Sequence, residues 1–309
     1  MYRDPVIVTG AGGFIGRHLV GALASAGLDI RPAFRRDPPA GGLLLDDQTN
    51  DTGLREALAG AGAVIHLAGR AHRTGEAPEE QADAFGTINR EWPLRLAAAG
   101  AAAGVRHFLF VSTIGVHGTQ GLIGHDSPLA PGTAYARSKA AAEAGLREEF
   151  PGHLVILRPP LVAGPGAPGN LARLARLASL PLPLPFGAVR NRRSLLSMRG
   201  LCRAIGAVLE RWGGGDAASG AYVLADAAPV STRDIVTAVR AGMARAPGLV
   251  PIAPALLRGA LAATGRGAMA GQLLDDLVVD PSAFQRDFPW RPEPESLTAL
   301  RELGAAWRR

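Results

Sequence analysis

Short, mainly apolar runs recur along the first half of the chain, and each is followed by glycine or polar residues. The runs lie at residues 5–8, 29–34, 43–45, 63–69 and 108–113. Strands of a parallel sheet covered on both faces have this continuous apolar pattern instead of strict alternation. Between the runs, residues 17–26 and 84–103 carry apolar side chains at helical spacing and end at Gly27 and Gly104. Alternating strands and helices predict an α/β fold around a parallel sheet.

Composition and charge narrow the possible function classes. The 309 residues, 19% of them charged, are typical of a globular protein with a large core. The net charge is +6, but the arginines are spread along the chain, which favours anionic small molecules over nucleic acid as partners. The single cysteine, Cys202, excludes an internal disulfide. With no signal-peptide pattern, no long apolar span and no metal-ligand spacing among the histidines, we expect a cytoplasmic protein without nucleic-acid, membrane or metal partners.

A glycine-rich loop directly follows the first predicted strand. Residues 9–16 read Thr-Gly-Ala-Gly-Gly-Phe-Ile-Gly and lead into the first predicted helix. Gly10, Gly13 and Gly16 allow a tight turn, close approach to a pyrophosphate and close packing of helix against strand, while the helix N-terminus supplies a positive dipole. The order strand, loop, helix makes a chance glycine-rich turn the weaker alternative. We therefore predict a Rossmann doubly wound parallel sheet that binds NAD(P).

The residues after the second strand bear on the choice of cofactor. An acidic side chain there binds the ribose hydroxyls of NAD, whereas arginine accommodates the phosphate of NADP. This chain has Arg35 and Arg36 at that point. The pair favours NADP, although two arginines are also compatible with a solvated strand end, so NAD stays open. Asp46 follows the third strand, where an adenine edge could be met.

Tyr135 and Lys139 are the strongest candidates for chemistry. Four residues apart, they share one face of a predicted helix, and Lys139 is the only lysine among 33 cationic side chains. A nearby ammonium lowers the pKa of a phenol, so we expect a proton donor and acceptor, against the alternative of a chance pair on a solvated helix. Ser112 and Thr113 end a strand, where ligands bind in open α/β sheets. A hydroxyl there could bond the same substrate oxygen.

These motifs resemble those of the extended short-chain dehydrogenase/reductases, and specifically the UDP-glucose 4-epimerase group of the NAD-dependent epimerase/dehydratases. The resemblance covers nearly the whole chain and rests on residues 9–16, 66–69, Asn89, 111–113, 135–139 with Glu143, 157–160 and 290–292. It implies an NAD(P)-dependent enzyme that acts on a nucleotide sugar, most often UDP-linked, and forms a homodimer. It also implies an NAD(P)-binding domain at residues 1–160 and a smaller substrate-binding α/β region at 161–309, partly interleaved with the first.

The resemblance also assigns roles to single residues. It implies that Thr113 is the catalytic hydroxyl with Ser112 beside it, that Tyr135 is the acid/base and that Lys139 binds the nicotinamide ribose. The residues expected to bind the cofactor are Gly10, Gly13, Phe14, Ile15, Gly16, Arg35, Arg36, Asp46, Leu67, Ala68, Gly69, Asn89, Tyr135, Lys139 and Pro159. The residues expected to bind the substrate are Thr113, Asn170, Leu171, Phe186 and Arg193.

Two reactions fit these residues. The overall resemblance favours epimerisation at C4 of a UDP-hexose or a UDP-N-acetylhexosamine through a 4-keto intermediate. The alternative is an NADPH-dependent reductase of a nucleotide 4-keto-6-deoxy sugar. Arg35 and Arg36 favour this reductase, because they indicate NADP, a cofactor that is exchanged after each turnover. A non-enzymatic NAD(P)-binding module is a more remote alternative, because Tyr135 and Lys139 are both present.

Three departures from the family pattern leave the sugar open. His117 stands where the family often has tyrosine, Leu161 replaces a frequent asparagine, and Arg199 replaces a frequent acidic residue. His117 and Leu161 border the expected substrate, so the sugar specificity of the best-known members does not transfer to this chain.

Overall fold

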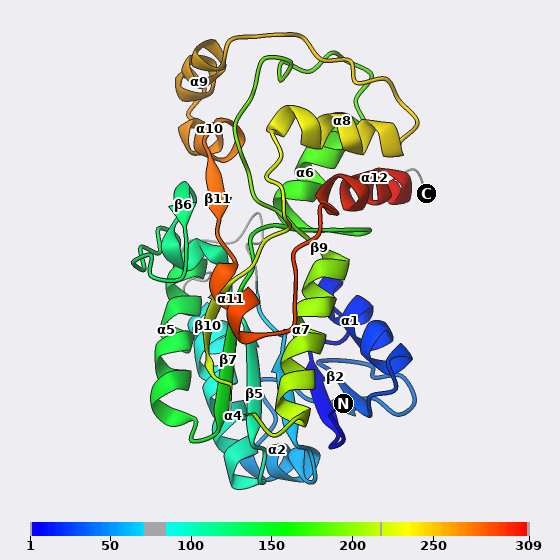
Figure 1. Ribbon diagram of the computed structural model, residues 1–309, viewed down its shortest axis with the longest axis vertical. Helices are drawn as coiled ribbons and strands as arrows, with labels where there is room; N and C mark the ends of the chain where they lie inside the picture. The colour runs from blue at the N-terminus through cyan, green and yellow to red at the C-terminus, as the bar shows by residue number, and fades with distance from the viewer. Residues whose placement is uncertain (1, 71–84, 217, 308–309) are drawn as a thin grey trace.

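A parallel sheet forms the centre of the protein in a computed structural model that describes residues 2–70, 85–216 and 218–307 (Figure 1). Within these residues seven strands pair in the order β10-β7-β5-β4-β1-β2-β3, and every neighbouring pair is parallel. The strands are β1 (Val6–Thr9), β2 (Ile30–Phe34), β3 (Leu43–Leu44), β4 (Ala63–His66), β5 (His107–Val111), β7 (His153–Arg158) and β10 (Gly220–Val223). The strand order reverses between β1 and β4, which confirms the expected doubly wound Rossmann fold.

Helices cover both faces of this sheet, which explains why its strands are continuously apolar. Val6 and Val8 of β1 pack with Leu201, whereas Ile7 between them packs with Leu54 on the opposite face. The first face is covered by α1 (Phe14–Ser25) and α7 (Met198–Gly213), and the second by α2 (Asp51–Leu58), α4 (Trp92–Ala102) and α5 (Ala134–Glu149). Because α7 and β10 come from the second half of the chain, that half contributes to the main sheet and its core.

A second group of helices lies beyond the carboxyl edge of the sheet, in the upper half of Figure 1. It comprises α6 (Gly169–Ala178), α8 (Thr232–Gly242), α9 (Pro254–Ala263), α10 (Gly267–Leu274) and α12 (Ser296–Trp307). These helices share their own apolar core, which includes Leu174, Val236 and Leu300. Two small parallel sheets connect this group to the rest, pairing β8 (Val162–Ala163) with β9 (Leu196–Ser197) and β11 (Leu277–Val279) with β6 (Gly121–Ile123).

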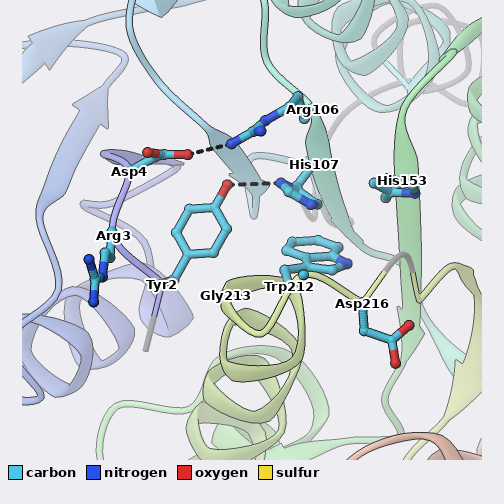
Figure 2. A pocket seen from close by; sticks show the side chains of 10 residues that line it. Tyr2, Arg3, Asp4, Arg106, His107, His153, Trp212, Gly213 and Asp216 are labelled. Carbon is cyan, nitrogen blue, oxygen red and sulfur yellow. Dashed lines mark hydrogen bonds and ion pairs between the residues drawn. The ribbon is translucent and has the colours of Figure 1, made fainter.

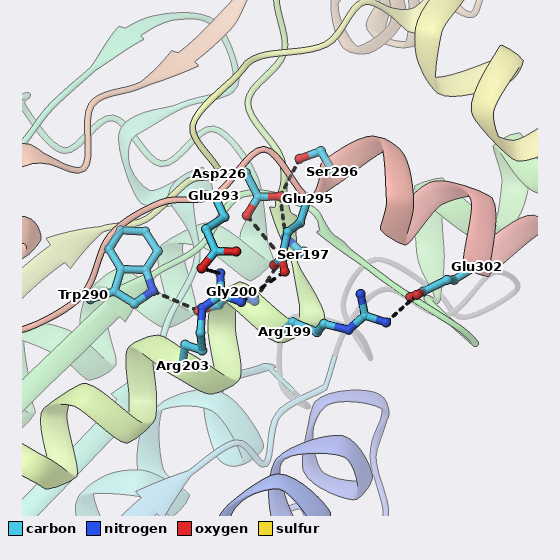
Figure 3. A network of polar contacts seen from close by, with 10 residues as sticks. All are labelled: Ser197, Arg199, Gly200, Arg203, Asp226, Trp290, Glu293, Glu295, Ser296 and Glu302. Atoms are coloured by element: carbon cyan, nitrogen blue, oxygen red, sulfur yellow. Dashed lines mark hydrogen bonds and ion pairs between the residues drawn. The ribbon is translucent and has the colours of Figure 1, made fainter.

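The segment that contains Trp290 ties the end of the chain to α7, as Figure 3 shows. Trp290 follows α11 (Ser282–Asp287), and its indole Nε1 donates a hydrogen bond to the carbonyl oxygen of Gly200, 3.2 Å away. Nearby, the buried carboxylate of Asp226 accepts hydrogen bonds from the hydroxyls of Ser197 and Ser296. Burial raises the pKa of Asp226 despite these donors. The hydrogen bonds of Trp290 and Ser296 therefore hold the segment that leads into α12 close to the start of α7.

The expected strands and helices are present, and several of their boundaries differ; β4, expected at 63–69, ends at His66, and α1, expected at 17–26, begins at Phe14. Strand β5 ends at Val111, so Ser112 and Thr113 lie just beyond it. The helix expected at 84–103 contains a π-helical turn, η1 (Thr87–Glu91), which continues into α4. Helix α8 ends at Gly242, and Ala244 then adopts a φ of 54°. No helix in the described residues has the length and apolar character to cross a membrane.

Candidate active site

The glycine loop forms a cradle at the carboxyl edge of the sheet. Gly10 has a φ of 69°, and a Cβ there would lie 2.8 Å from the backbone nitrogen of Ala68, at the end of β4. A Cβ at Gly16 would lie 2.6 Å from the Cα of Ala11, so only glycine allows α1 to pack this closely. Among the described residues, no side chain caps the N-terminus of α1 after Gly13. Its first N–H groups therefore remain free for an anion, as the pyrophosphate of a dinucleotide requires.

Arg35 and Arg36 lie beside this cradle. Both follow β2 directly and are exposed, and neither guanidinium makes a hydrogen bond or ion pair with the other residues that the structure describes. The ring of Phe34, immediately before them, is 3.4 Å from where a Cβ on Gly12 would lie. Asp46, by contrast, accepts hydrogen bonds from Thr49 within its own turn. The end of β2 thus presents two free cations next to the glycine loop.

Lys139 is buried in α5, one turn after Tyr135. The helix begins after Thr133, whose Oγ1 accepts a hydrogen bond from the backbone nitrogen of Ala136. Lys139 is 3% exposed, and its Nζ donates to the carbonyl oxygen of Val111 over 3.0 Å. Burial lowers the pKa of this ammonium to about 8, while the carboxylate of Glu143 opposes the shift. Lys139 therefore remains mostly charged at neutral pH.

Tyr135 does not have the lowered pKa that the sequence predicted. Its ring packs edge-on against Phe85, with 6.1 Å between the ring centroids. Burial raises the pKa of the phenol to about 12. The expectation of a depressed pKa is wrong for the chain as it stands, because burial sets the shift and the ammonium of Lys139 is directed at the Val111 carbonyl instead. Tyr135 is thus a protonated donor until a ligand alters its surroundings.

Ser112 and Thr113 differ in how far their hydroxyls are available. Thr113 caps the 3-10 helix η2 (Ile114–His117), and its Oγ1 accepts a hydrogen bond from the backbone nitrogen of Gly115 over 3.1 Å. The hydroxyl hydrogen of Thr113 is left to donate to a ligand. Ser112 is buried and helps to lower the pKa of Glu143, although its Oγ forms no hydrogen bond of ordinary geometry within the described residues. Thr113 is therefore the better placed of the two to meet a substrate.

Asn89 joins the end of β4 to the helix of Tyr135. It lies fully buried in η1, a π-helical turn of a kind common at functional sites. Its amide accepts from the backbone nitrogen of Arg70 and donates to the Ser138 hydroxyl, over 2.7 and 3.2 Å. A Cβ on Gly69 would lie 3.3 Å from Asn89 Oδ1 and 3.4 Å from Lys139 Nζ. Asn89 and Lys139 thus flank Gly69, where the sequence predicted that the cofactor binds.

The expected substrate residues are placed less uniformly. Asn170 is exposed at the start of α6 and donates a hydrogen bond to Gln272. Leu171 and Phe186 are buried in the core of the upper helices. Arg193 is 7% exposed. Of its guanidinium nitrogens, only Nη1 donates hydrogen bonds within the described residues, and the shorter of these is 2.9 Å long to the carbonyl oxygen of Asp275. Its other guanidinium nitrogens remain available to an anion.

The family is shown by direct comparison. Residues 6–224 match the model of the NAD dependent epimerase/dehydratase family. The chain belongs to this family. The chain is thus an enzyme of the extended short-chain dehydrogenase/reductase type, as the sequence predicted.

Individual relatives of this epimerase/dehydratase cover nearly its full length. A UDP-glucose 4-epimerase of Vibrio cholerae is 29% identical over 307 residues, which cover 94% of this chain and 92% of the relative. A solved structure of MoeE5 in complex with UDP-glucose and NAD superposes with a TM-score of 0.77 at 23% identity, covering 99% of both chains. A dTDP-4-dehydrorhamnose reductase of Bacillus anthracis in complex with NADP has a TM-score of 0.74 at 19% identity, covering 97% of this chain and 98% of that one.

A separate cavity of about 330 Å³ lies at the opposite edge of the sheet (Figure 2). Its wall includes His107 and His153, which begin β5 and β7, whereas Thr113 follows the other end of β5. The hydroxyl of Tyr2 lies 2.8 Å from His107 Nδ1, and burial lowers the pKa of His107 to about 4. The cavity is therefore lined by aromatic and charged side chains at the end of the sheet away from Thr113, and it is not part of the candidate active site of this epimerase/dehydratase.

Two further histidines received no catalytic role from the sequence. His66 is structural, because its Nδ1 lies 2.9 Å from the Thr9 hydroxyl and burial lowers its pKa to about 3. His117 was noted only as a departure from the family pattern, yet it is buried against Arg158 at the end of the 3-10 helix that Thr113 caps. The sequence signal for His117 was its position four residues after Thr113, but only the fold brings it to Arg158.

Proposed function

We propose that this enzyme moves a hydride between a nicotinamide cofactor and C4 of a nucleotide sugar, and that it epimerises C4 of a UDP-hexose or UDP-N-acetylhexosamine. The observation that supports this most is the gathering of Tyr135, Lys139 and Thr113 beside the glycine loop. The similarity to a UDP-glucose 4-epimerase along 94% of the chain adds the substrate class. In this proposal residues 1–160 bind the cofactor and residues 161–309 supply most of the substrate contacts.

The residues divide the chemistry as follows. Bound cofactor would accept the hydride from C4 and then return it. Thr113 donates a hydrogen bond to the oxygen on C4, and Tyr135, as the phenolate, takes the proton of that oxygen and gives it back when the hydride returns. Lys139 contributes a buried positive charge that stabilises the phenolate when it forms. Rotation of the 4-keto sugar, followed by return of the hydride to its other face, inverts the configuration at C4.

The same geometry supports a second candidate, reduction of a nucleotide 4-keto-6-deoxy sugar by NADPH. The observation that favours it is the exposed pair Arg35 and Arg36 beside the glycine loop, with no hydrogen-bonded or ion-paired partner in the described residues. Guanidinium groups bind phosphate through paired, charge-assisted hydrogen bonds, so the pair suits the 2′-phosphate of NADP. A reductase releases its spent cofactor after each turnover, whereas an epimerase returns it to the starting state.

On the substrate side, we assign the diphosphate to Arg193 and Asn170. Arg193 keeps free guanidinium nitrogens after its bonds to the backbone, and Asn170 is exposed at the start of α6. The buried side chains of Leu171 and Phe186 would support this site through packing or backbone contacts. We also expect a homodimer in solution, which light scattering can test; a strictly monomeric mass would remove that expectation.

The first experiment identifies the cofactor and the reaction together. Nucleotide released by denaturing the purified enzyme is identified by mass spectrometry, and UDP-glucose and UDP-N-acetylglucosamine are then incubated with the enzyme and followed by NMR. Retained NAD with conversion to the C4 epimer supports the epimerase. Empty sites that bind NADPH more tightly than NADH, with reduction of a 4-keto sugar nucleotide, support the reductase. Tyr135→Phe is the control, and activity that survives it contradicts both.

A further inference from the structure

A buried carboxylate lies one helical turn beyond Lys139. Glu143 is fully buried in α5, on the face that carries Tyr135 and Lys139. The guanidinium of Arg158, at the end of β7, donates from Nε to Glu143 Oε1 and Oε2 over 3.1 and 3.2 Å. Arg147 Nη2 adds a bond of 3.0 Å. Burial would raise the pKa of Glu143, but the hydrogen bonds and charge of Arg158 hold it below its usual value.

His117 completes this cluster from a different element. Nη1 of Arg158 donates to His117 Nε2 over 2.9 Å, and His117 Nδ1 lies 3.1 Å from the carbonyl oxygen of Pro128. A carbonyl only accepts and a guanidinium only donates, so the hydrogen of the neutral imidazole is on Nδ1. The two partners therefore fix one tautomer and leave no place for a second ring proton.

The cluster spans the segments that carry the candidate active site. His117 ends the 3-10 helix that Thr113 caps, and Glu143 belongs to the helix of Tyr135 and Lys139. Arg158 precedes Pro159, whose carbonyl oxygen accepts a hydrogen bond from the backbone nitrogen of Ile114 over 2.9 Å. A change at any member would therefore act on the segments that carry Thr113, Tyr135 and Lys139.

We propose that His117, as a neutral acceptor, is a positioning residue that holds Arg158 on Glu143 and so keeps Lys139 and Tyr135 in register with Thr113. This inference rests on the proposed function for its kinetic consequence. Protonation of His117 would place a proton and a positive charge against the Arg158 guanidinium and break the contact. The charged groups that face His117 are Arg158 from β7 and Glu143 from α5.

The pH dependence follows from the direction of the pKa shift. Burial lowers the pKa of His117; the Pro128 carbonyl opposes this, Arg158 adds to it and Glu143 opposes it. The pKa therefore lies below the ordinary value of 6.5. His117 is neutral at pH 7, and the cluster comes apart only as the pH falls through this lowered pKa. Activity should show an acid limb below 6.5 that belongs to His117.

The sole lysine of the chain allows a test that needs no substrate. Protein labelled with ¹³C at lysine Cε gives one lysine signal, which reports on Lys139. We expect its main titration near pH 8 and a smaller inflection below 6.5 as His117 becomes protonated. His117→Gln, which retains an acceptor at the position of Nε2 but does not titrate, should abolish the second inflection. An acid inflection that persists in His117→Gln, or none in the native enzyme, overturns the proposal even if the nucleotide-sugar assignment is correct.

Kinetics then separate positioning from mere stability. His117→Asn retains a donor at the position of Nδ1 but loses the acceptor for Arg158. We expect its kcat to fall by about 10-fold to 100-fold with little change in KM, because misplacement of reacting groups slows the chemical step. His117→Gln should keep most of kcat and lose the acid limb. Equal kcat and equal pH profiles in native enzyme and both variants, with similar Tm, would show that His117 positions nothing. If no nucleotide sugar is turned over, the proposed function fails and the lysine titration still decides this inference.

Discussion

Lys139 donates its buried ammonium hydrogen bond to the carbonyl oxygen of Val111, the last residue of β5, over 3.0 Å. Two residues further along the chain is Thr113, and one turn back along α5 is Tyr135. This hydrogen bond therefore fixes α5, which carries Tyr135, against β5, which leads to Thr113. The ammonium also lies 4.4 Å from the ring centroid of Phe110, a distance at which a cation is attracted to an aromatic face.

Because Lys139 is buried, the direction in which its pKa shifts can be predicted. The pKa of about 8 lies below the usual 10.5, so the ammonium should be lost as the pH rises through about 8, and activity that requires this charge should decline there. Glu143→Gln removes the charge that opposes the shift and should lower the pKa of Lys139 further. The ¹³C signal of the single lysine measures both values.

Glu148→Gln is the matched control for this titration. Glu148 lies on the same helix but is exposed, so its replacement should leave the pKa of Lys139 unchanged. A midpoint near 10.5 in the native enzyme would mean that water reaches Lys139, and the burial argument would then be wrong.

The glycine loop gives a second prediction with an internal control. Gly16→Ala would place a Cβ 2.6 Å from the Cα of Ala11, against backbone that cannot move aside, so we expect it to abolish binding of NADH and NADPH. Gly21→Ala lies on the same helix with nothing within 4 Å of its added Cβ and should stabilise the fold by about 1 kcal/mol. Fluorescence titration and thermal unfolding distinguish the two. Normal cofactor binding by Gly16→Ala would mean that the loop is not part of the cofactor site.

Local patterns were sufficient to predict the glycine loop and five of the seven strands of the central sheet, whereas β7 and β10 were not among the strands expected for this sheet. The five predicted strands lie in short, mainly apolar runs, and the loop at residues 9–16 needs glycine where the backbone passes Ala68 and Ala11. Tyr135 and Lys139 were predictable as a pair because four residues on a helix return to the same face. In these cases a short stretch of sequence already contains both partners.

The remaining features depend on residues far apart in the chain. Leu277 pairs with Gly121 across more than 150 residues, and no local pattern indicates that partner. The pKa of Tyr135 could not be predicted from Lys139 alone, since burial, to which tertiary packing contributes, outweighs the expected charge effect. The upper helices enclose the side chain of Phe186, an expected substrate residue, in their core, and no local pattern indicates that burial. Sequence spacing gives the identity of a candidate residue and not its surroundings.

Arg35 and Arg36 give a prediction about cofactor preference. Replacing both with serine should weaken NADPH binding by about 10-fold to 100-fold, since each charge-assisted contact to phosphate is worth a factor of this order, while NADH binding stays the same. Arg233→Ser changes the charge at an exposed position on α8 and serves as the control. An equal loss of affinity for NADH and NADPH would mean that the arginines bind no 2′-phosphate. An unchanged affinity for NADPH would mean that the two arginines are simply solvated side chains at the end of β2.

Thr113 is open to a test in which its two functions are separated. Thr113→Val removes both the hydroxyl hydrogen for the substrate and the acceptor for the Gly115 nitrogen, so kcat should fall by about 100-fold and stability by about 1 kcal/mol. Thr113→Ser keeps the hydroxyl and should recover most of both. Turnover of the nucleotide sugar and thermal unfolding are measured on the same preparations. If Thr113→Val loses stability but retains its kcat, the hydroxyl serves only the helix cap, and the proton of the substrate oxygen must be handled by Tyr135 without it.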